Sequence, residues 1–164
     1  MRELAEVLLR GPSTLTSAER EMIATFVSTR NGCDFCQLSH RAAAASHLDG
    51  NYALVDAVRR DPQSAYVSDK LKALLAIAGK VQQDGKHVTT RDVDRARAAG
   101  ATDVEIHDAV LIAAAFCMFN RYVDGLATST PADPNVYDAM GKRMAHQGYV
   151  NASQAQRQAD VAPR

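Results

Sequence analysis

The chain contains no tryptophan, and phenylalanine and tyrosine together account for only 5% of its 164 residues. Alanine is used heavily instead, within a hydrophobic fraction of 46%. Because alanine is the strongest helix former and aromatic residues favour strands, this composition predicts closely packed helices rather than sheets. The length suffices for one domain with a substantial core, but not comfortably for two.

The sequence also has no net charge, since 19 basic residues balance 19 acidic ones. A balanced chain lacks the positive field that attracts nucleic acids and anionic membrane surfaces, so neither is an expected partner. No segment reaches about 18 uncharged apolar residues, the length that a membrane span requires. The longest apolar run, Ala109 to Phe119, suits a buried helix.

A secretion signal is missing as well. The N-terminal stretch MRELAEVLLRGPS places four charged residues among its apolar ones, and it lacks the apolar region and cleavage site of a signal peptide. Cysteine is scarce, with three residues in all. We therefore expect a cytoplasmic protein in a reducing compartment, where a CxxC pair is more often catalytic or metal-binding than a structural crosslink.

Helix start and stop signals divide the chain into a series of expected helices. Capping boxes begin two of them, Thr16 with Glu19 and Thr102 with Glu105, and Asn31-Gly32 ends the first of these two. The expected helices span residues 1–10, 16 to about 31, 33–47, 52–60, from 68 onward, 90–99, 102–127 and 136–147. They make up one all-α domain over residues 1–150. Residues 151–164 are polar without apolar periodicity, and we expect them to form a mobile tail.

The stretch RNGCDFCQLSH contains the residues with the clearest chemical potential, Cys33, Cys36 and His40. On one helix these three side chains share an arc of roughly 60°. Cys36 and His40 are neighbours one turn apart, so the imidazole could take the proton of the thiol. Cys33 lies at the expected helix N-terminus, where free N–H groups and the helix dipole favour a thiolate. A disulfide between the cysteines would close a tiny loop, which suits a reversible redox pair better than a structural crosslink.

Two other interpretations of the same residues remain open. The pattern offers three zinc ligands, but a structural site needs four and no second Cys/His pair follows at finger spacing, so a zinc-binding redox-sensor or interaction module is an alternative. A packed helix with incidental cysteines is another. A c-type haem would need a histidine directly after the second cysteine, where Gln37 stands, and an iron–sulfur cluster would need further ligands. No cofactor or metal is therefore expected.

Leu15 to Ala44 resembles the signature of the alkylhydroperoxidase D-like, peroxidase-related family of the carboxymuconolactone decarboxylase superfamily. That signature has a glutamate twelve positions before the first cysteine of a CxxC pair and a histidine four positions after the second. Glu21, Cys33, Cys36 and His40 fit at each place. The resemblance implies an all-α helical bundle of the alkylhydroperoxidase D-like type.

The resemblance also implies a thiol-dependent peroxidase that reduces hydroperoxides in antioxidant defence. Cys36 would attack the hydroperoxide as a thiolate, and Cys33 would condense with the resulting sulfenic acid to give a disulfide. His40 and Glu21 would form a proton relay, partly through water. A dithiol, such as a lipoyl-bearing protein, would be the reductant. Members of the family form trimers or hexamers, so a homo-oligomer is expected, with a hexamer first and a trimer second.

One residue departs from the family pattern. The best-known members have a further histidine directly before the second cysteine, where this chain has Phe35, so one element of the proton relay is missing. A lactone decarboxylase-like enzyme of the same superfamily is a further alternative, although such members generally lack CxxC. Without the resemblance, Glu21 would be expected to be an exposed residue of its helix. Burial against the cysteine helix would convert it to a base. Asn120 and Arg121 are expected to make solvent contacts at the end of the apolar helix.

Overall fold

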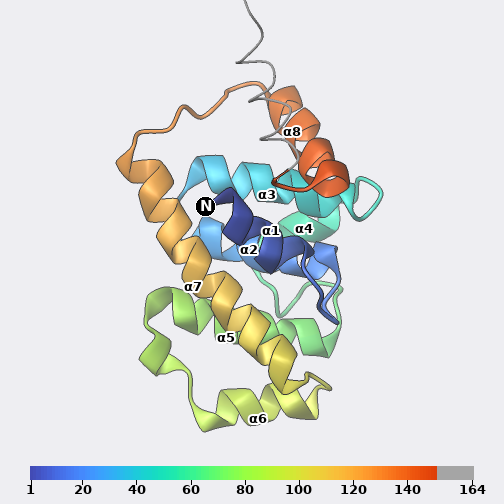
Figure 1. Ribbon diagram of the computed structural model, residues 1–164. Coiled ribbons are helices and arrows are strands. Elements are labelled where there is room, and N and C mark those ends of the chain that lie inside the picture. The colour runs from blue at the N-terminus through green and yellow to red at the C-terminus, as the bar shows by residue number, and fades with distance from the viewer. Residues whose placement is uncertain (151–164) are drawn as a thin grey trace, which may run out of the picture.

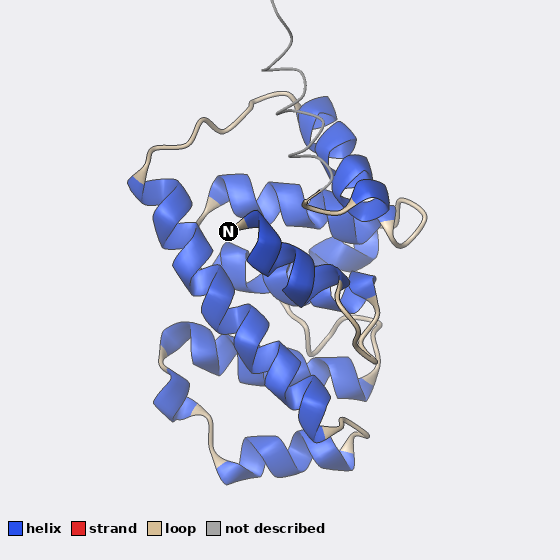
Figure 2. Cartoon of the chain, viewed as in Figure 1, coloured by secondary structure: helices blue, strands red, loops and turns tan. Residues whose placement is uncertain are grey.

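The computed structural model describes residues 1–150 of the chain. Within these residues all regular structure is helical, with eight α-helices, one short 3-10 helix and no strand (Figure 1 and Figure 2). The elements are α1 (Arg2–Arg10), α2 (Ser17–Arg30), α3 (Asp34–Ser46), α4 (Tyr52–Arg60), α5 (Asp69–Gln83), η1 (Gly85–His87), α6 (Thr90–Ala98), α7 (Asp103–Gly125) and α8 (Pro134–Gln147). The expected all-α class is confirmed. The tail expected over residues 151–164 lies outside the described residues.

The helices begin where local signals predict them. The Thr16 N–H donates to the Glu19 carboxylate at 2.9 Å, and the Glu19 N–H donates to Thr16 Oγ1 at 3.2 Å. The capping box at Thr102 repeats this arrangement at the start of α7. The start of α8 differs from the prediction, because the helix begins at Pro134 rather than at residue 136. Proline suits the first helical position, where the missing N–H needs no partner.

Helix α2 runs through the centre of the molecule and packs against α3, α5 and α7 (Figure 1). Helix α3 lies in turn between α2 and α8, while α6 covers the opposite end against α5. Phe26, Leu74, Ile112 and Phe116 are among the largest buried side chains and join α2, α5 and α7 in one core.

Helix α7 contains the long apolar run and is buried on one face only. Ala109, Ile112 and Phe116 lie in the core, whereas Leu111 and Met118 are exposed. By length and composition alone α7 could cross a membrane, but the core helix of a soluble protein passes the same test. The prediction of a buried helix for Ala109 to Phe119 therefore holds for the face toward α2 and α5.

The turn between α2 and α3 sets the geometry of the site. Asn31 ends α2, Gly32 adopts a positive φ of 71°, and the Cys33 N–H donates back to the Ser28 carbonyl at 3.1 Å. Glycine is suited to this left-handed conformation because it has no Cβ. The chain thus reverses within a few residues, and α3 packs along α2.

Helix α8 completes this side of the molecule by a close approach to α3. A Cβ placed on Gly141 would lie 2.4 Å from the carbonyl carbon of Ala42 and 2.5 Å from the Ala42 Cβ. Only the absence of a side chain at Gly141 allows the two helices to pack at this distance. The packing of α8 also determines where residues 148–150 begin, and these residues lead from the end of α8 toward α1.

Candidate active site

The predicted site residues Glu21 and His40 face each other between α2 and α3. His40 Nδ1 lies 2.8 Å from Glu21 Oε2, and the Glu21 side chain is fully buried. Because an ionised carboxylate can only accept hydrogen bonds, Nδ1 of His40 carries the proton of this contact, and in a neutral imidazole Nε2 is the proton acceptor. The exposed position that a helical glutamate takes by default is thus wrong for Glu21, which is buried against the cysteine helix.

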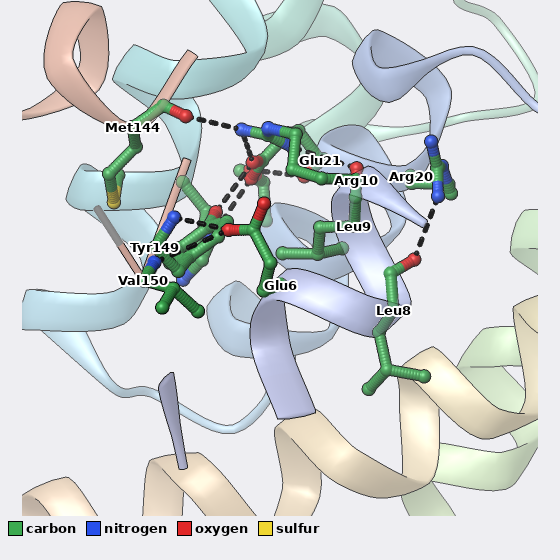
Figure 3. A network of polar contacts seen from close by, with 11 residues as sticks. Glu6, Leu8, Leu9, Arg10, Arg20, Glu21, Met144, Tyr149 and Val150 are labelled. Atoms are coloured by element: carbon green, nitrogen blue, oxygen red, sulfur yellow. Dashed lines mark hydrogen bonds and ion pairs between the residues drawn. The ribbon is translucent and has the colours of Figure 1, made fainter. Parts of the chain in front are cut away.

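Two further groups hold the second oxygen of this carboxylate (Figure 3). Arg10 Nη2 and the Tyr149 hydroxyl each lie 2.6 Å from Glu21 Oε1. Burial alone would raise the pKa of Glu21, but His40, Arg10 and Tyr149 outweigh it and lower the pKa to about 2. Glu21 is therefore ionised at neutral pH, which suits it to orient the His40 ring rather than to exchange protons.

Both motif cysteines are free thiols held close to the start of α3. Burial raises the pKa of the Cys33 thiol, and the Asp124 carboxylate raises it further, although the Cys36 N–H at the helix start lowers it. Burial also raises the pKa of the Cys36 thiol, while hydrogen bonds with Cys33 and Asn120 lower it. The helix terminus thus acts on Cys33 in the expected direction, but desolvation outweighs it and the pKa of the thiol is raised.

Asn120 belongs to the site rather than to the surface. Its side chain is 1% exposed, and its amide donates to Ser28 Oγ at 3.1 Å while its carbonyl accepts from Asn31 at 2.8 Å. The expected solvent contact is wrong for Asn120, because its side chain faces Ser28 and Asn31 inside the molecule, whereas Arg121 is exposed as expected. These bonds hold Asn120 beside Cys36, where its amide favours the thiolate form.

Cys36 and His40 line a cavity of about 370 Å³. Cys33 is not among the described residues that line it. Most of the remaining lining is apolar or uncharged; it comprises Met1, Ala5, Phe35, Ser39, Phe116, Phe119, Val123, Met140, Met144, Gln147, Gly148 and Tyr149. Arg2 and Arg143, both exposed, are the other lining residues, and no acidic residue is among them. The cavity therefore brings a thiol and an imidazole to an apolar space with cations at its solvent side.

In the part of the chain that the structure describes, no side chains form the ligand set that a zinc site requires. No group of three or more His, Cys, Asp and Glu side chains that could hold a metal occurs among residues 1–150. His40 already uses Nδ1 for Glu21. The geometry is instead compatible with acid–base chemistry, because a carboxylate fixes an imidazole that lines the same cavity as a thiol.

Arg10 and Tyr149 could not be found by sequence reasoning. Arg10 occupies the last turn of α1, and Tyr149 follows the glycine that ends α8. Both lie far from the CxxC motif in the chain, and neither forms a local pattern with it. Only the packing of α1 against α2 and of α8 against α3 brings them to Glu21.

Comparison with known proteins agrees with this geometry. Residues 1–49, which include Glu21, both motif cysteines and His40, match the model of the carboxymuconolactone decarboxylase family. The expected family resemblance is confirmed. No curated protein sequence matches the chain.

Two solved structures share the fold. An uncharacterized peroxidase-related protein from Silicibacter sp. TM1040 is 28% identical, with a TM-score of 0.73 over 83% of this chain and 69% of that one. An alkylhydroperoxidase AhpD core structure, an uncharacterized peroxidase-related protein from Ralstonia eutropha JMP134, is 26% identical, with a TM-score of 0.72 over 84% of this chain and 70% of that one. The alkylhydroperoxidase D-like bundle expected from the sequence is thus confirmed as the fold.

Proposed function

We propose that the protein is a thiol-dependent peroxidase that reduces organic hydroperoxides, with Cys36 as the attacking thiol. The observation that carries this proposal is the position of Cys36 on the cavity wall together with His40, whose Nδ1 is bound by the ionised Glu21. Cys33 lies behind it, fully buried, where it can resolve the oxidised sulfur but is less accessible to substrate.

The first step oxidises Cys36. His40 Nε2 accepts the thiol proton, and the Cys36 thiolate attacks the terminal oxygen of the hydroperoxide. The O–O bond breaks, an S–O bond forms, and the departing alkoxide takes the proton from His40 to leave as an alcohol. Cys36 is then a sulfenic acid, and the peroxide has been reduced by two electrons.

The second step forms the disulfide. The Cys33 sulfur attacks the Cys36 sulfur, the S–O bond breaks and water leaves with the Cys33 proton. A dithiol reductant then reduces the disulfide by exchange and becomes a disulfide itself, which restores both thiols. A lipoyl-bearing protein is our proposal for that reductant, on the basis of the family resemblance.

The lining of the cavity favours an organic hydroperoxide over hydrogen peroxide. Phe35, Phe116 and Phe119 present rings to a space large enough for an alkyl or aryl group. Phe35 stands where the family pattern has a histidine, so the site exchanges a polar relay group for apolar contact with the substrate. Antioxidant defence is the corresponding physiological role.

The test uses pre-reduced full-length protein and cumene hydroperoxide. We expect two thiols to be consumed per peroxide, cumyl alcohol to form in equal amount, and a Cys33–Cys36 disulfide to be found by mass spectrometry of non-reduced peptides. Added dihydrolipoamide should give repeated turnover. Cys117→Ser, which keeps both motif thiols, is the control and should behave as the wild type. Folded protein whose Cys33 and Cys36 remain reduced under excess peroxide would refute the proposal.

A further inference from the structure

The residues that follow α8 return to α1 and are held there by one carboxylate (Figure 3). Glu6 Oε2 accepts the Tyr149 N–H at 2.5 Å and the Val150 N–H at 3.4 Å. Gly148 has a positive φ of 71°, and a Cβ there would lie 2.6 Å from Glu6 Oε2. Glycine at this position therefore allows the backbone to approach the carboxylate closely.

This anchoring places Tyr149 among the residues that orient His40. The Tyr149 hydroxyl lies 2.6 Å from Glu21 Oε1 and 3.3 Å from His40 Nδ1. The tyrosine ring stacks on the imidazole with centroids 6.0 Å apart, and the Arg10 guanidinium lies over the tyrosine ring at 5.1 Å from its centroid. Tyr149 thus touches every member of the buried charge network around Glu21.

We propose that Tyr149 is a positioning residue of the site and that Glu6 acts as its anchor. The proposal rests on the proposed peroxidase function. With Arg10 and the Tyr149 hydroxyl on Oε1, Oε2 of Glu21 is the oxygen left for His40, which fixes the carboxylate. The tyrosine ring then limits rotation of the imidazole from one side.

Phe116 limits the same imidazole from another direction, edge-on at 4.6 Å between ring centroids. His40 is therefore confined by two aromatic rings and one carboxylate, with Nδ1 held toward Glu21. A ring so fixed presents Nε2 in one direction, as a base must to take a proton from a thiol one turn away on α3.

Glu6 has a different relation to the chemistry. It does not line the cavity among the described residues, and its hydrogen bonds there go to the backbone at positions 149 and 150. Any effect of Glu6 on peroxide reduction must therefore pass through the placement of Tyr149. Because Glu6 and Tyr149 should act through the same contact, the effects of substituting each of them should not be additive in a double variant, and this can be measured.

The experiment compares Tyr149→Phe, Glu6→Ala and the double variant with Glu3→Ala, which removes an exposed carboxylate from the same helix. The rate of disulfide formation is measured against cumene hydroperoxide concentration. We expect Tyr149→Phe to lower the maximal rate by about 10- to 100-fold, the loss of a hydrogen bond to a charged group, with little change in apparent KM. Phenylalanine keeps the ring, so a purely packing role would leave the rate unchanged.

Glu6→Ala should lower the same rate, and the double variant should be no slower than the slower single variant. Gly148→Ala, which crowds the Glu6 carboxylate without removing it, should act as Glu6→Ala does. The Nδ1 proton of His40, observed by NMR, should shift or broaden in these variants and stay unchanged in Glu3→Ala. Wild-type rates in Tyr149→Phe, or effects of the two single variants that multiply, would overturn the proposal.

The NMR signal separates this proposal from the proposed function. If the wild-type protein does not react with hydroperoxides, but Glu6→Ala and Tyr149→Phe change the His40 signal, the proposed peroxidase function is refuted and the positioning role of Tyr149 stands. A wild-type protein that reduces hydroperoxides, with a His40 signal insensitive to both substitutions, would refute the positioning alone.

Discussion

Among the single residues, His40 has its proposed role as a base because the Cys36 thiol is only weakly acidic. Burial raises the pKa of the Cys36 thiol, so little thiolate exists at neutral pH without a base. In the proposed mechanism the Glu21 carboxylate holds Nδ1 of His40, so that Nε2 can accept that proton. The reactivity proposed for Cys36 then depends on proton transfer to His40 rather than on a lowered thiol pKa.

His40→Ala should lower the rate of peroxide reaction by about 100- to 10,000-fold near pH 7, the usual cost of a lost general base. Only free thiolate can then react, and because the thiol pKa is raised, the thiolate fraction should grow about tenfold per pH unit from pH 6 to pH 9. The wild type should depend less steeply on pH above neutrality. Stopped-flow rates across this range measure both effects, with the exposed His107→Ala as control. Parallel profiles for the variant and the wild type would contradict this role of His40.

The two arginines that line the cavity should influence which hydroperoxides the protein prefers. Arg2 and Arg143 line it without an acidic neighbour in the lining, so a carboxylate on the substrate should be favoured. A fatty-acid hydroperoxide should be reduced up to about fivefold more efficiently than its methyl ester, the size of an exposed ion pair. Arg143→Gln should lower this acid-to-ester ratio, whereas Lys142→Gln on the same helix should not. Equal kcat/KM for acid and ester in the wild type would exclude the preference.

The site could be predicted from sequence only where its residues share a local pattern. Cys33, Cys36 and His40 lie within one helix, so their spacing alone places them on one face. Glu21 came with them through the family pattern. Burial raises the pKa of Cys33 and outweighs the effect of the helix terminus. It depends on how α7 and α8 pack over α3, and no local spacing encodes it.

At the scale of elements, the helix ends were the most predictable part of the fold. Capping boxes and the Asn31-Gly32 stop are local signals that act within a few residues, and the structure uses each of them. The packing of the helices was less predictable, because it depends on close approaches between distant residues. Gly141 against Ala42 is such a contact, and it determines how α8 lies on α3.

Gly141→Ala should therefore destabilise the protein by about 1–3 kcal/mol, since a methyl group has no room at this contact. Gly125→Ala is the matched control, because a Cβ there meets no atom within 4 Å. Alanine replaces glycine within a helix in both variants, so the difference reports packing rather than propensity. Urea unfolding followed by circular dichroism measures both free energies. Equal stability of the two variants would show that α8 does not need the close contact.

At the scale of the whole molecule, an apolar face remains open on α7 and α1. Leu111, Met118 and Tyr122 are between 41% and 55% exposed on α7, and Leu4 and Val7 are exposed on the adjoining α1. Leu111 and Met118 are two turns apart and share one side of the helix. An apolar surface of this kind is typical of a subunit interface.

We propose that this face joins copies of the chain into a homo-oligomer larger than a dimer, a hexamer first and a trimer second. Leu111→Glu combined with Met118→Glu should dissociate it, because two carboxylates would be buried without partners. Light scattering of the wild type and the variant measures the masses. A wild-type monomer throughout the micromolar range would contradict the proposal.

The proposed mechanism depends on which of the two sulfurs reacts with the peroxide, and this can be measured directly. Cys33→Ser and Cys36→Ser proteins are treated with one equivalent of cumene hydroperoxide in the presence of a sulfenic-acid trap and analysed by mass spectrometry. We predict a trapped adduct on Cys36 in the Cys33→Ser protein, because nothing resolves its sulfenic acid, and no reaction at Cys33 in the Cys36→Ser protein. An adduct on Cys33 in Cys36→Ser, with none on Cys36 in Cys33→Ser, would contradict the account and leave His40 and Glu21 without a catalytic role.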